Sequence, residues 1–452
     1  MKFFEKEYLA PRYMAISSVL ALLLAFTGVI LPTGFSPYIL PIPAFLIIMS
    51  IFTTPRVAFI ASVVLLSIMS VGFQYNVQYL VAFILVSLIA VIMINQIKYA
   101  NRFDLIKTGF NIGIAGLIIV LSIYILEKCL IDVSNILMIK NSAFIFINGI
   151  LSSIIALGSL PLFESTFKII TPYGLAELGD HNQKLLKRLQ MDAPGTYHHS
   201  LMVSNLCEAA AEAIGADPIL ARVGALYHDI GKLKRPLFFV ENQSYFLIEN
   251  PHNKFTPRIS KMIITAHPKD GIEIAKEYGL PPVIQNFILQ HHGEGLASYF
   301  YNQAVKEEGL ENVKEEQFRY TGPKPNSKET AILMIADAVE SAVRSLKNPT
   351  PEEIEAMIDK IIVERLNDAQ LSDSPLTLKD IKTIAATFSR ILRGMQHNRI
   401  KYQENLAAEL QKEKINMPAK LLDEDLENKI KQLEGEKLPK DNSADEVEND
   451  NQ

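Results

Sequence analysis

The feature that most constrains this chain is a series of long apolar runs, nearly all of which lie before residue 165 of 452. A helix needs about 20 predominantly apolar residues to cross the hydrocarbon core of a bilayer. Because helices of soluble proteins keep a polar face, several nearly uncharged runs in succession predict membrane spans rather than buried core helices. The second and third runs are short and adjacent, which also suits a tight helical hairpin. Six runs meet this description, at residues 13–32, 38–53, 55–72, 76–95, 108–127 and 142–163.

Lys and Arg residues in the connections predict how these spans are oriented. The N-terminal segment and the connections after the second and fourth spans are basic, whereas those after the first and third contain no Lys or Arg. The connection after the fifth span has only Lys128 and Lys140. Because cytoplasmic loops carry an excess of positive residues, this alternation puts both termini in the cytosol and requires an even number of spans. We therefore expect a multi-pass membrane protein, with the lipid bilayer as a partner.

Composition argues against several classes of protein. Charged residues make up 21% of the chain and lie almost entirely after residue 165, and the net charge is −5. This balance argues against a general binder of nucleic-acid polymers. The two cysteines, Cys129 and Cys207, exclude a disulfide framework and a cysteine-based zinc site. No charged residue lies deep within a predicted span, so a transporter is not the preferred interpretation.

The second half of the chain has an amphipathic helical pattern with recognisable helix caps. Asp217 before Pro218 reads as an N-cap followed by a proline in the first turn, and Gly231 is expected to close that helix. Thr377 with Asp380 resembles a capping box. The threonine-proline device recurs at Thr256-Pro257 and Thr350-Pro351.

These patterns predict an all-α protein in three parts. Residues 1–164 form a transmembrane bundle of six helices, and residues 165–404 form a cytosolic all-α domain whose helices run from about 184 to 400. Within that domain, residues 305–328 contain a charged stretch followed by a loop. Residues 405–452 form a charged tail, which is expected to be disordered at least from about Gly435.

Histidines and aspartates recur in the second half in a pattern that suits metal binding. Imidazole and carboxylate are ligands that suit divalent iron, manganese and similar ions. Neighbouring residues on a helix point about 100° apart, so two adjacent ligands usually serve different metals. Asp229 is therefore expected to bridge two metals, and Asp337 lies in an apolar run where a carboxylate is costly unless it is paired or coordinated. The pattern comprises Tyr197-His198-His199-Ser200, His228-Asp229, His267, His291-His292 and Asp337.

Each of these residues also has a structural interpretation. A single histidine at a helix end, such as His267, is more often structural, and an isolated histidine pair is weak evidence. Asp337 could accept hydrogen bonds from helix N-terminal amides instead. Either His198 or His199 could be the first ligand; we favour His199, with His198 packing or contacting the substrate. The remaining histidines, His181, His252 and His397, are interpreted as structural or surface residues.

The order of these ligands resembles that of the two-metal members of the HD superfamily. The string from Ala193 to Arg235, APGTYHHSLMVSNLCEAAAEAIGADPILARVGALYHDIGKLKR, is similar to the seven-transmembrane HD receptor family. Two further segments are similar to the same family: Phe318-Arg319-Tyr320, which precedes GPKP, and ADAVESAVRSL at 336–346. The resemblance covers nearly all of residues 13–404. Typical members have an additional first span and a large extracellular domain, whereas this sequence starts at what would be the second span. The resemblance therefore does not extend to the family's sensing input.

The resemblance implies a helical fold and hydrolysis of cyclic di-AMP to linear pApA with two divalent ions, manganese or iron. Asp229 and Lys232 would be catalytic, with Lys232 contacting phosphate or protonating the leaving group, unless it only complements the helix dipole. His198, Arg319 and Lys324 are candidates for substrate binding, although solvation is the simpler interpretation of Lys324. The metal ligands implied are His199, His228, Asp229, His267, His291, His292 and Asp337.

Other functions remain as alternatives at this point. Phosphodiesterases of the HD-GYP type, which act on cyclic di-GMP, continue the histidine pair to a Gly-Tyr-Pro tripeptide, but here the chain reads HHGEGLASYFYNQ. A nucleotide triphosphohydrolase or alarmone hydrolase would normally lack the histidine pair and use one metal. A non-catalytic membrane scaffold would first have lost ligands, and none is lost. A homodimer is an open alternative for the assembly.

Overall fold

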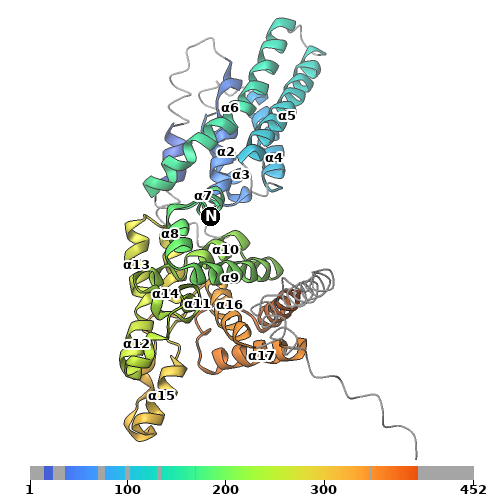
Figure 1. Ribbon diagram of the computed structural model, residues 1–452. Helices are drawn as coiled ribbons and strands as arrows, with labels where there is room; N and C mark the ends of the chain where they lie inside the picture. The colour runs from blue at the N-terminus through green and yellow to red at the C-terminus, as the bar shows by residue number, and fades with distance from the viewer. Residues whose placement is uncertain are drawn as a thin grey trace, which may run out of the picture.

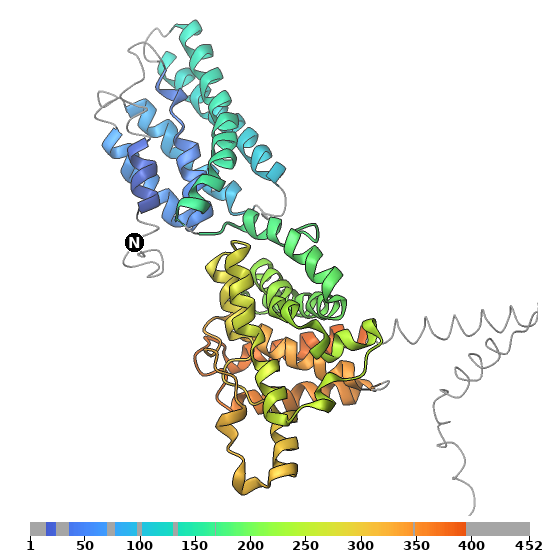
Figure 2. The same ribbon diagram turned by 60° about the vertical axis from the view of Figure 1, so that its left-hand side comes forward.

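The computed structural model describes residues 15–23, 36–69, 77–96, 102–129, 134–167, 169–346 and 349–394. The predicted all-α class is confirmed, because these residues form helices and contain no strand beyond one isolated antiparallel bridge between Leu296 and Arg319. A bundle of apolar helices stands above a second helical part (Figures 1 and 2). The proposed tail at 405–452 and His397 lie outside the described residues.

The first part contains a helical segment within each of the six predicted positions, although residues 24–32 of the first predicted span lie outside the described residues. Three of them, α4, α5 and α6, are long and apolar enough to cross a membrane, whereas the two segments before them are shorter. The helix α6 runs through the predicted boundary at 164, and both α5 and α6 are longer than predicted because their polar ends continue the helix beyond the apolar run. The segments are residues 15–23, η2 Pro37–Ile39, α2 Ile42–Phe52, α3 Pro55–Met69, α4 Val77–Ile94, α5 Arg102–Lys128 and α6 Asn135–Phe167.

Polar groups inside this bundle are used to join helices. The Asn148 Nδ2 atom donates hydrogen bonds to the carbonyl oxygens of Tyr38, at 2.8 Å, and Leu40, at 2.7 Å. Those carbonyls lie at the break between η2 and α2, where Pro41 and Pro43 remove backbone donors. Without water in the bilayer core, such groups must be satisfied by the protein. Asn148 therefore fixes α6 against this irregular segment.

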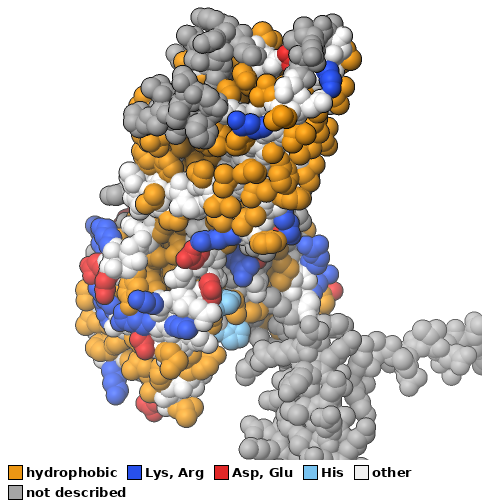
Figure 3. All heavy atoms as spheres, turned by 90° about the horizontal axis from the view of Figure 1, so that it is seen from above, with side chains coloured by type: hydrophobic (Ala, Val, Ile, Leu, Met, Phe, Trp, Pro, Cys, Tyr) orange, Lys and Arg blue, Asp and Glu red, His pale blue; other side chains and the backbone are white. Residues whose placement is uncertain are grey.

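Apolar side chains cover the outside of the same bundle. Ile136 is 79% exposed and Leu22 is 69% exposed, although both are large hydrophobic residues. Figure 3 shows apolar side chains gathered over this part, with Lys and Arg where it meets the second part. An outward-facing apolar surface of this extent indicates contact with lipid. The chain is thus built for membrane association.

The described residues of the second part form two large apolar clusters and a small third one around Ala304, Val313 and Phe318. One large cluster centres on α9, α16 and α17, and the other joins α8, α10, α13 and α14. Its helices of five or more residues are α7 Pro172–Leu178, α8 Lys184–Asp192, α9 Pro194–Ala213, α10 Pro218–Tyr227, η3 Ile230–Lys234, α11 Val240–Phe246, α12 Pro257–Thr265, α13 His267–Glu277, α14 Pro282–Gln290, α15 Ser298–Glu308, α16 Lys328–Ser345, α17 Pro351–Asn367 and residues 378–394. Residues 305–328 begin with the end of α15 and two short 3₁₀ turns before the predicted loop.

The predicted helix caps are confirmed, with one correction. The Asp217 carboxylate accepts from the Leu220 amide at 3.0 Å, and Thr377 and Asp380 form reciprocal cap hydrogen bonds of 3.1 Å. Gly231 does not close a helix, because α10 ends at Tyr227 and Gly231 lies within η3. A Cβ atom at Gly231 would lie 1.9 Å from the carbonyl oxygen of His267. This glycine is needed for the close approach of η3 to the start of α13.

The short helix α7 connects the two parts (Figures 1 and 2). Glu164 near the end of α6 accepts a hydrogen bond from the Thr171 amide at 2.8 Å. Arg102 of α5 forms an ion pair with Glu177 of α7 at 2.6 Å. On the other side, the Tyr227 hydroxyl of α10 donates to the Leu178 carbonyl at 2.8 Å. The helix α7 thus contacts both α5 and α10.

Candidate metal centre

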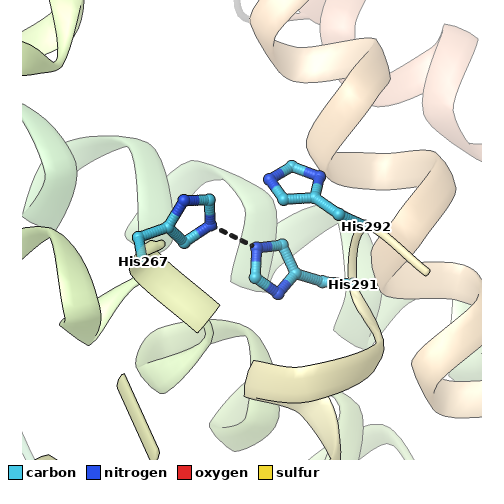
Figure 4. A group of neighbouring side chains, drawn as sticks. All are labelled: His267, His291 and His292. Carbon is cyan, nitrogen blue, oxygen red and sulfur yellow. Dashed lines mark hydrogen bonds between the residues drawn. The ribbon is translucent and has the colours of Figure 1, made fainter. Parts of the chain in front are cut away.

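The seven residues predicted as ligands converge at one place from five helices. His228 and Asp229 follow α10 directly, His291 and His292 follow α14, and His267 begins α13. Their ligand atoms form two groups, each with all atoms within 4.8 Å of one another. We call the first group, on α9, α10 and α16, site A, and the second site B. Site A contains His199, His228, Asp229 and Asp337, and site B contains His267, His291 and His292 (Figure 4).

Asp229 lies between the two sites and presents one oxygen to each. Its Oδ2 atom is 3.2 Å from His228 Nε2 and 3.7 Å from His199 Nε2, in site A. Its Oδ1 atom is 3.4 Å from His267 Nε2 and 3.6 Å from His291 Nε2, in site B. The carboxylate is 1% exposed, so both oxygens face protein groups rather than bulk water.

Asp337 spans the sites in a similar way from the opposite helix. Its Oδ1 atom is 3.0 Å from His199 Nε2 and 3.8 Å from His228 Nε2. Its Oδ2 atom is 3.7 Å from His292 Nδ1. The two carboxylates therefore lie among imidazole nitrogens that come from three different helix ends and from α9.

Local hydrogen bonds orient three of the rings. The Nδ1 atoms of His228, His267 and His291 contact the backbone carbonyl oxygens three residues earlier, at 2.6, 2.7 and 2.9 Å. If Nδ1 carries the proton in each, the lone pair lies on Nε2. Each ring lies within two residues after the end of a helix and folds back onto the last turn of that helix, so that its Nε2 atom faces Asp229.

Several atoms of the centre lack the partners that buried polar groups require. The Nε2 atom of His228 and the Oδ1 atom of Asp229 are buried without a hydrogen-bond partner among the described residues, whereas Asp229 Oδ2 is contacted by the Lys232 ammonium at 2.7 Å. The Nε2 atoms of His267 and His291 face each other at 3.0 Å (Figure 4). Two nitrogens bound to one cation at about 2.1 Å would lie about 3.0–3.4 Å apart at ordinary bond angles. The donor set and this spacing fit a divalent cation.

The electrostatics of site B suit ligand atoms that must be free of protons, and those of site A differ. Burial would lower the pKa of His228, but the carboxylates of Asp229 and Asp337 outweigh it and raise that pKa to about 10. Burial lowers the pKa of His291 to about 3 and that of His267 to about 4. Burial alone would raise the pKa of Asp229, but the charges of His228 and Lys232 outweigh it and hold that pKa well below its usual range. The rings at site B are therefore neutral and the carboxylate ionised, which is the state that binds a metal.

Lys232 lies at the edge of the centre, beside Asp229. Its Nζ atom is 2.7 Å from Asp229 Oδ2 and 2.7 Å from Glu241 Oε1, and it lies 4.9 Å from the centre of the Phe239 ring. Burial would lower the pKa of Lys232, but these two carboxylates raise it above its ordinary value. The ammonium group therefore stays charged.

The three residues predicted to bind substrate are not in the two ligand groups. His198 is exposed, whereas His199 is 2% exposed and belongs to site A. The Arg319 guanidinium forms ion pairs with Asp368, at 2.7 Å, and with Glu315. Lys324 lies 3.7 Å from a Glu294 carboxylate oxygen. The internal ion pairs of Arg319 leave it less available for phosphate than its charge suggests.

Sequence reasoning missed three residues that the fold brings to the centre. Glu340 accepts from His199 Nδ1 at 2.5 Å, Glu241 pairs with Lys232, and the Tyr320 ring lies 4.3 Å from that of His292. Glu340 stands three residues after Asp337 in the same apolar run, and that i, i+3 spacing is a signal that would have found it. Tyr320 belongs to the Phe318-Arg319-Tyr320 motif, but its ring was not predicted to lie at the centre. No sequence pattern around Glu241 indicates its place beside Lys232.

Known proteins resemble this chain in both parts. A family model described as a 7TM receptor with intracellular HD hydrolase matches residues 1–171, and an HD domain model matches residues 196–342. The cyclic-di-AMP phosphodiesterase PgpH of Bacillus subtilis (strain 168) is 40% identical over 373 residues, which are 81% of this chain and 51% of the relative. PgpH of Listeria monocytogenes serotype 1/2a (strain 10403S) is 44% identical over 308 residues, 68% of this chain and 42% of the relative.

A solved structure also resembles part of this chain. It is the HD domain of L. monocytogenes phosphodiesterase PgpH in complex with cyclic-di-AMP. The two are 49% identical, and the match covers 48% of this chain and 99% of that chain, with a TM-score of 0.46. The chain spans about half the length of the curated relatives it matches.

Proposed function

This chain belongs to the family of 7TM receptors with an intracellular HD hydrolase, and from that premise we propose that it is a membrane-anchored, metal-dependent phosphodiesterase that hydrolyses cyclic di-AMP to linear pApA. The observation that carries the proposal is Asp229, a buried carboxylate with one oxygen facing each of two imidazole groups. The chain is 40% and 44% identical in sequence to two cyclic-di-AMP phosphodiesterases, which supports cyclic di-AMP as the substrate.

The seven converging residues would hold two divalent ions, with manganese or iron suited to the ligand types. Site A would hold one ion and site B the other, with Asp229 as the shared ligand. When bound, a pair of such ions polarises a phosphodiester and acidifies the attacking water.

The protein's own residues would then position the reacting groups. In the reaction, water adds to one phosphorus, the bond from that phosphorus to a ribose 3′ oxygen breaks, and the 3′ oxygen receives a proton. Lys232 is beside Asp229 and stays charged, so it suits contact with a phosphate oxygen better than proton donation. The Tyr320 ring covers His292 and would limit the entry of bulk water on that side.

The experiment is to incubate the full chain, purified in detergent, with manganese and cyclic di-AMP and to separate the products by chromatography. We expect pApA as the product, with no turnover after chelation. Absence of turnover from a folded chain that contains metal would contradict the proposal.

Base preference is tested in the same assay. We expect cyclic di-AMP to be cleaved faster than cyclic di-GMP, because the chain lacks the Gly-Tyr-Pro continuation after His291-His292. Equal or faster turnover of cyclic di-GMP would favour the alternative substrate.

We propose that the protein lies in a bacterial cell membrane, with both termini and the HD domain in the cytosol. We also propose a homodimer, which light scattering of the purified protein would test.

Cys129 is exposed just after α5, at the predicted outer side, whereas Cys207 is buried in α9. An impermeant thiol reagent should therefore label Cys129 on intact cells. Labelling of Cys129 only after permeabilisation would invert the topology.

A further inference from the structure

His199 is oriented differently from the other histidines of the centre. The rings of His228, His267 and His291 are oriented by carbonyl groups three residues earlier on their own chain segments. The His199 Nδ1 atom instead contacts the carboxylate of Glu340, at 2.5 Å and 141 positions away in the sequence. The orientation of this one ligand thus depends on how α9 packs against α16.

The helix α16 holds both nitrogens of this ring. Asp337 Oδ1 lies 3.0 Å from His199 Nε2, and Glu340 Oε2 lies at the opposite nitrogen. Asp337 and Glu340 are three residues apart, so they project from the same face of one helix. His199 is 2% exposed and Glu340 7%, which keeps water from replacing either contact.

The chemistry of the partner also differs. A carboxylate that accepts a hydrogen bond from the Nδ1–H group of a metal-binding histidine fixes the tautomer of the ring. It also makes the Nε2 atom a stronger electron-pair donor to the metal. A backbone carbonyl group is neutral, so it raises the basicity of the ring less than a carboxylate does. The same carboxylate oxygen of Glu340 also lies 3.8 Å from the guanidinium of Arg344, one turn further along α16.

From this geometry we infer that Glu340 is a positioning residue for site A: it holds the His199 ring toward the metal and makes site A the tighter of the two sites. The inference rests on the proposed function, because it requires that site A bind a divalent ion.

The test measures manganese binding by the full chain in detergent, by elemental analysis at graded chelator concentrations. In a His267→Ala background, which weakens site B, the remaining ion reports on site A. There we expect Glu340→Ala to weaken binding by about 10- to 100-fold, the range for loss of such a partner. Glu340→Gln, which keeps an acceptor oxygen but loses the charge, should weaken it less. The control is Glu355→Gln. Glu355 lies on α17 and its carboxylate pairs with Arg393 on the helix at residues 378–394, so the substitution should not change manganese affinity at either site.

A double-mutant cycle separates positioning from a general structural role. If Glu340 acts only through His199, then Glu340→Ala should have no further effect on site A once His199→Ala has been made. Additive losses, or unchanged affinity in Glu340→Ala, would overturn the inference. If Glu340→Ala does not fold, as judged by melting of the metal-free chain, the same cycle with Glu340→Gln decides. If the unmodified chain fails to bind two ions, the proposed function fails instead, so the two failures are distinguishable.

Discussion

The two parts of this chain are both helical, yet they distribute polar and apolar residues in opposite ways. In the membrane part, large apolar residues face outward and a buried asparagine joins helices through backbone carbonyls. In the HD part, apolar residues fill the core, and buried imidazoles and carboxylates from five helices gather at one place. Buried polar groups therefore join helices in the membrane part, whereas in the HD part a group of them forms the candidate metal centre.

The strongest test of this comparison removes the shared carboxylate of the HD part. Asp229→Ala should lower the rate of hydrolysis by about 10³-fold or more, because the charge stabilisation at the reacting phosphate is lost. Both ions should be lost with it, while the helical circular dichroism is retained. A variant that still holds two ions by elemental analysis would show that Asp229 does not bridge the sites.

The next effect concerns the cation beside the centre. Lys232→Met should reduce kcat by about 10²-fold while metal content is kept, since one charged contact to the transition state is removed. Lys234→Met is the matched control, because its ammonium lies in the same 3₁₀ helix but pairs with Asp270 and Glu273. If kcat fell equally in the two variants, the position of the Lys232 ammonium beside Asp229 would not explain the loss of activity.

A smaller effect is expected from the buried polar residue of the membrane part. Asn148→Leu should destabilise the bundle by about 1–2 kcal/mol, because two carbonyl groups lose their donor in a region without water. Metal content should stay unchanged. Ser122→Ala, whose hydroxyl bonds only within its own helix, is the control. Thermal melting in detergent measures both; loss of metal in Asn148→Leu would break the separation of roles between the parts.

The smallest effect should follow from removing the membrane part altogether. No described residue before 169 contributes a ligand atom to sites A and B. Residues 165–452 should therefore bind metal and hydrolyse substrate at a rate within about tenfold of the full chain, or ~1.4 kcal/mol in activation free energy. A folded, metal-loaded fragment without activity would show that contacts such as Arg102–Glu177 are needed to shape the centre.

The fold class, the positions of the apolar helices, most of the helix caps and the ligand types can be predicted from the amino-acid sequence. These are local properties: an apolar run of sufficient length needs a bilayer, a threonine before a proline caps a helix, and an imidazole or carboxylate keeps its chemistry wherever it lies.

Only the tertiary structure decided which groups face each other. It buried His199 and exposed His198, used Gly231 for close packing rather than as a helix end, and tied Arg319 into ion pairs with Asp368 and Glu315. It also brought Glu340 to His199 across 141 positions. No local pattern could reveal these contacts, because each depends on the packing of helices that are far apart in the chain.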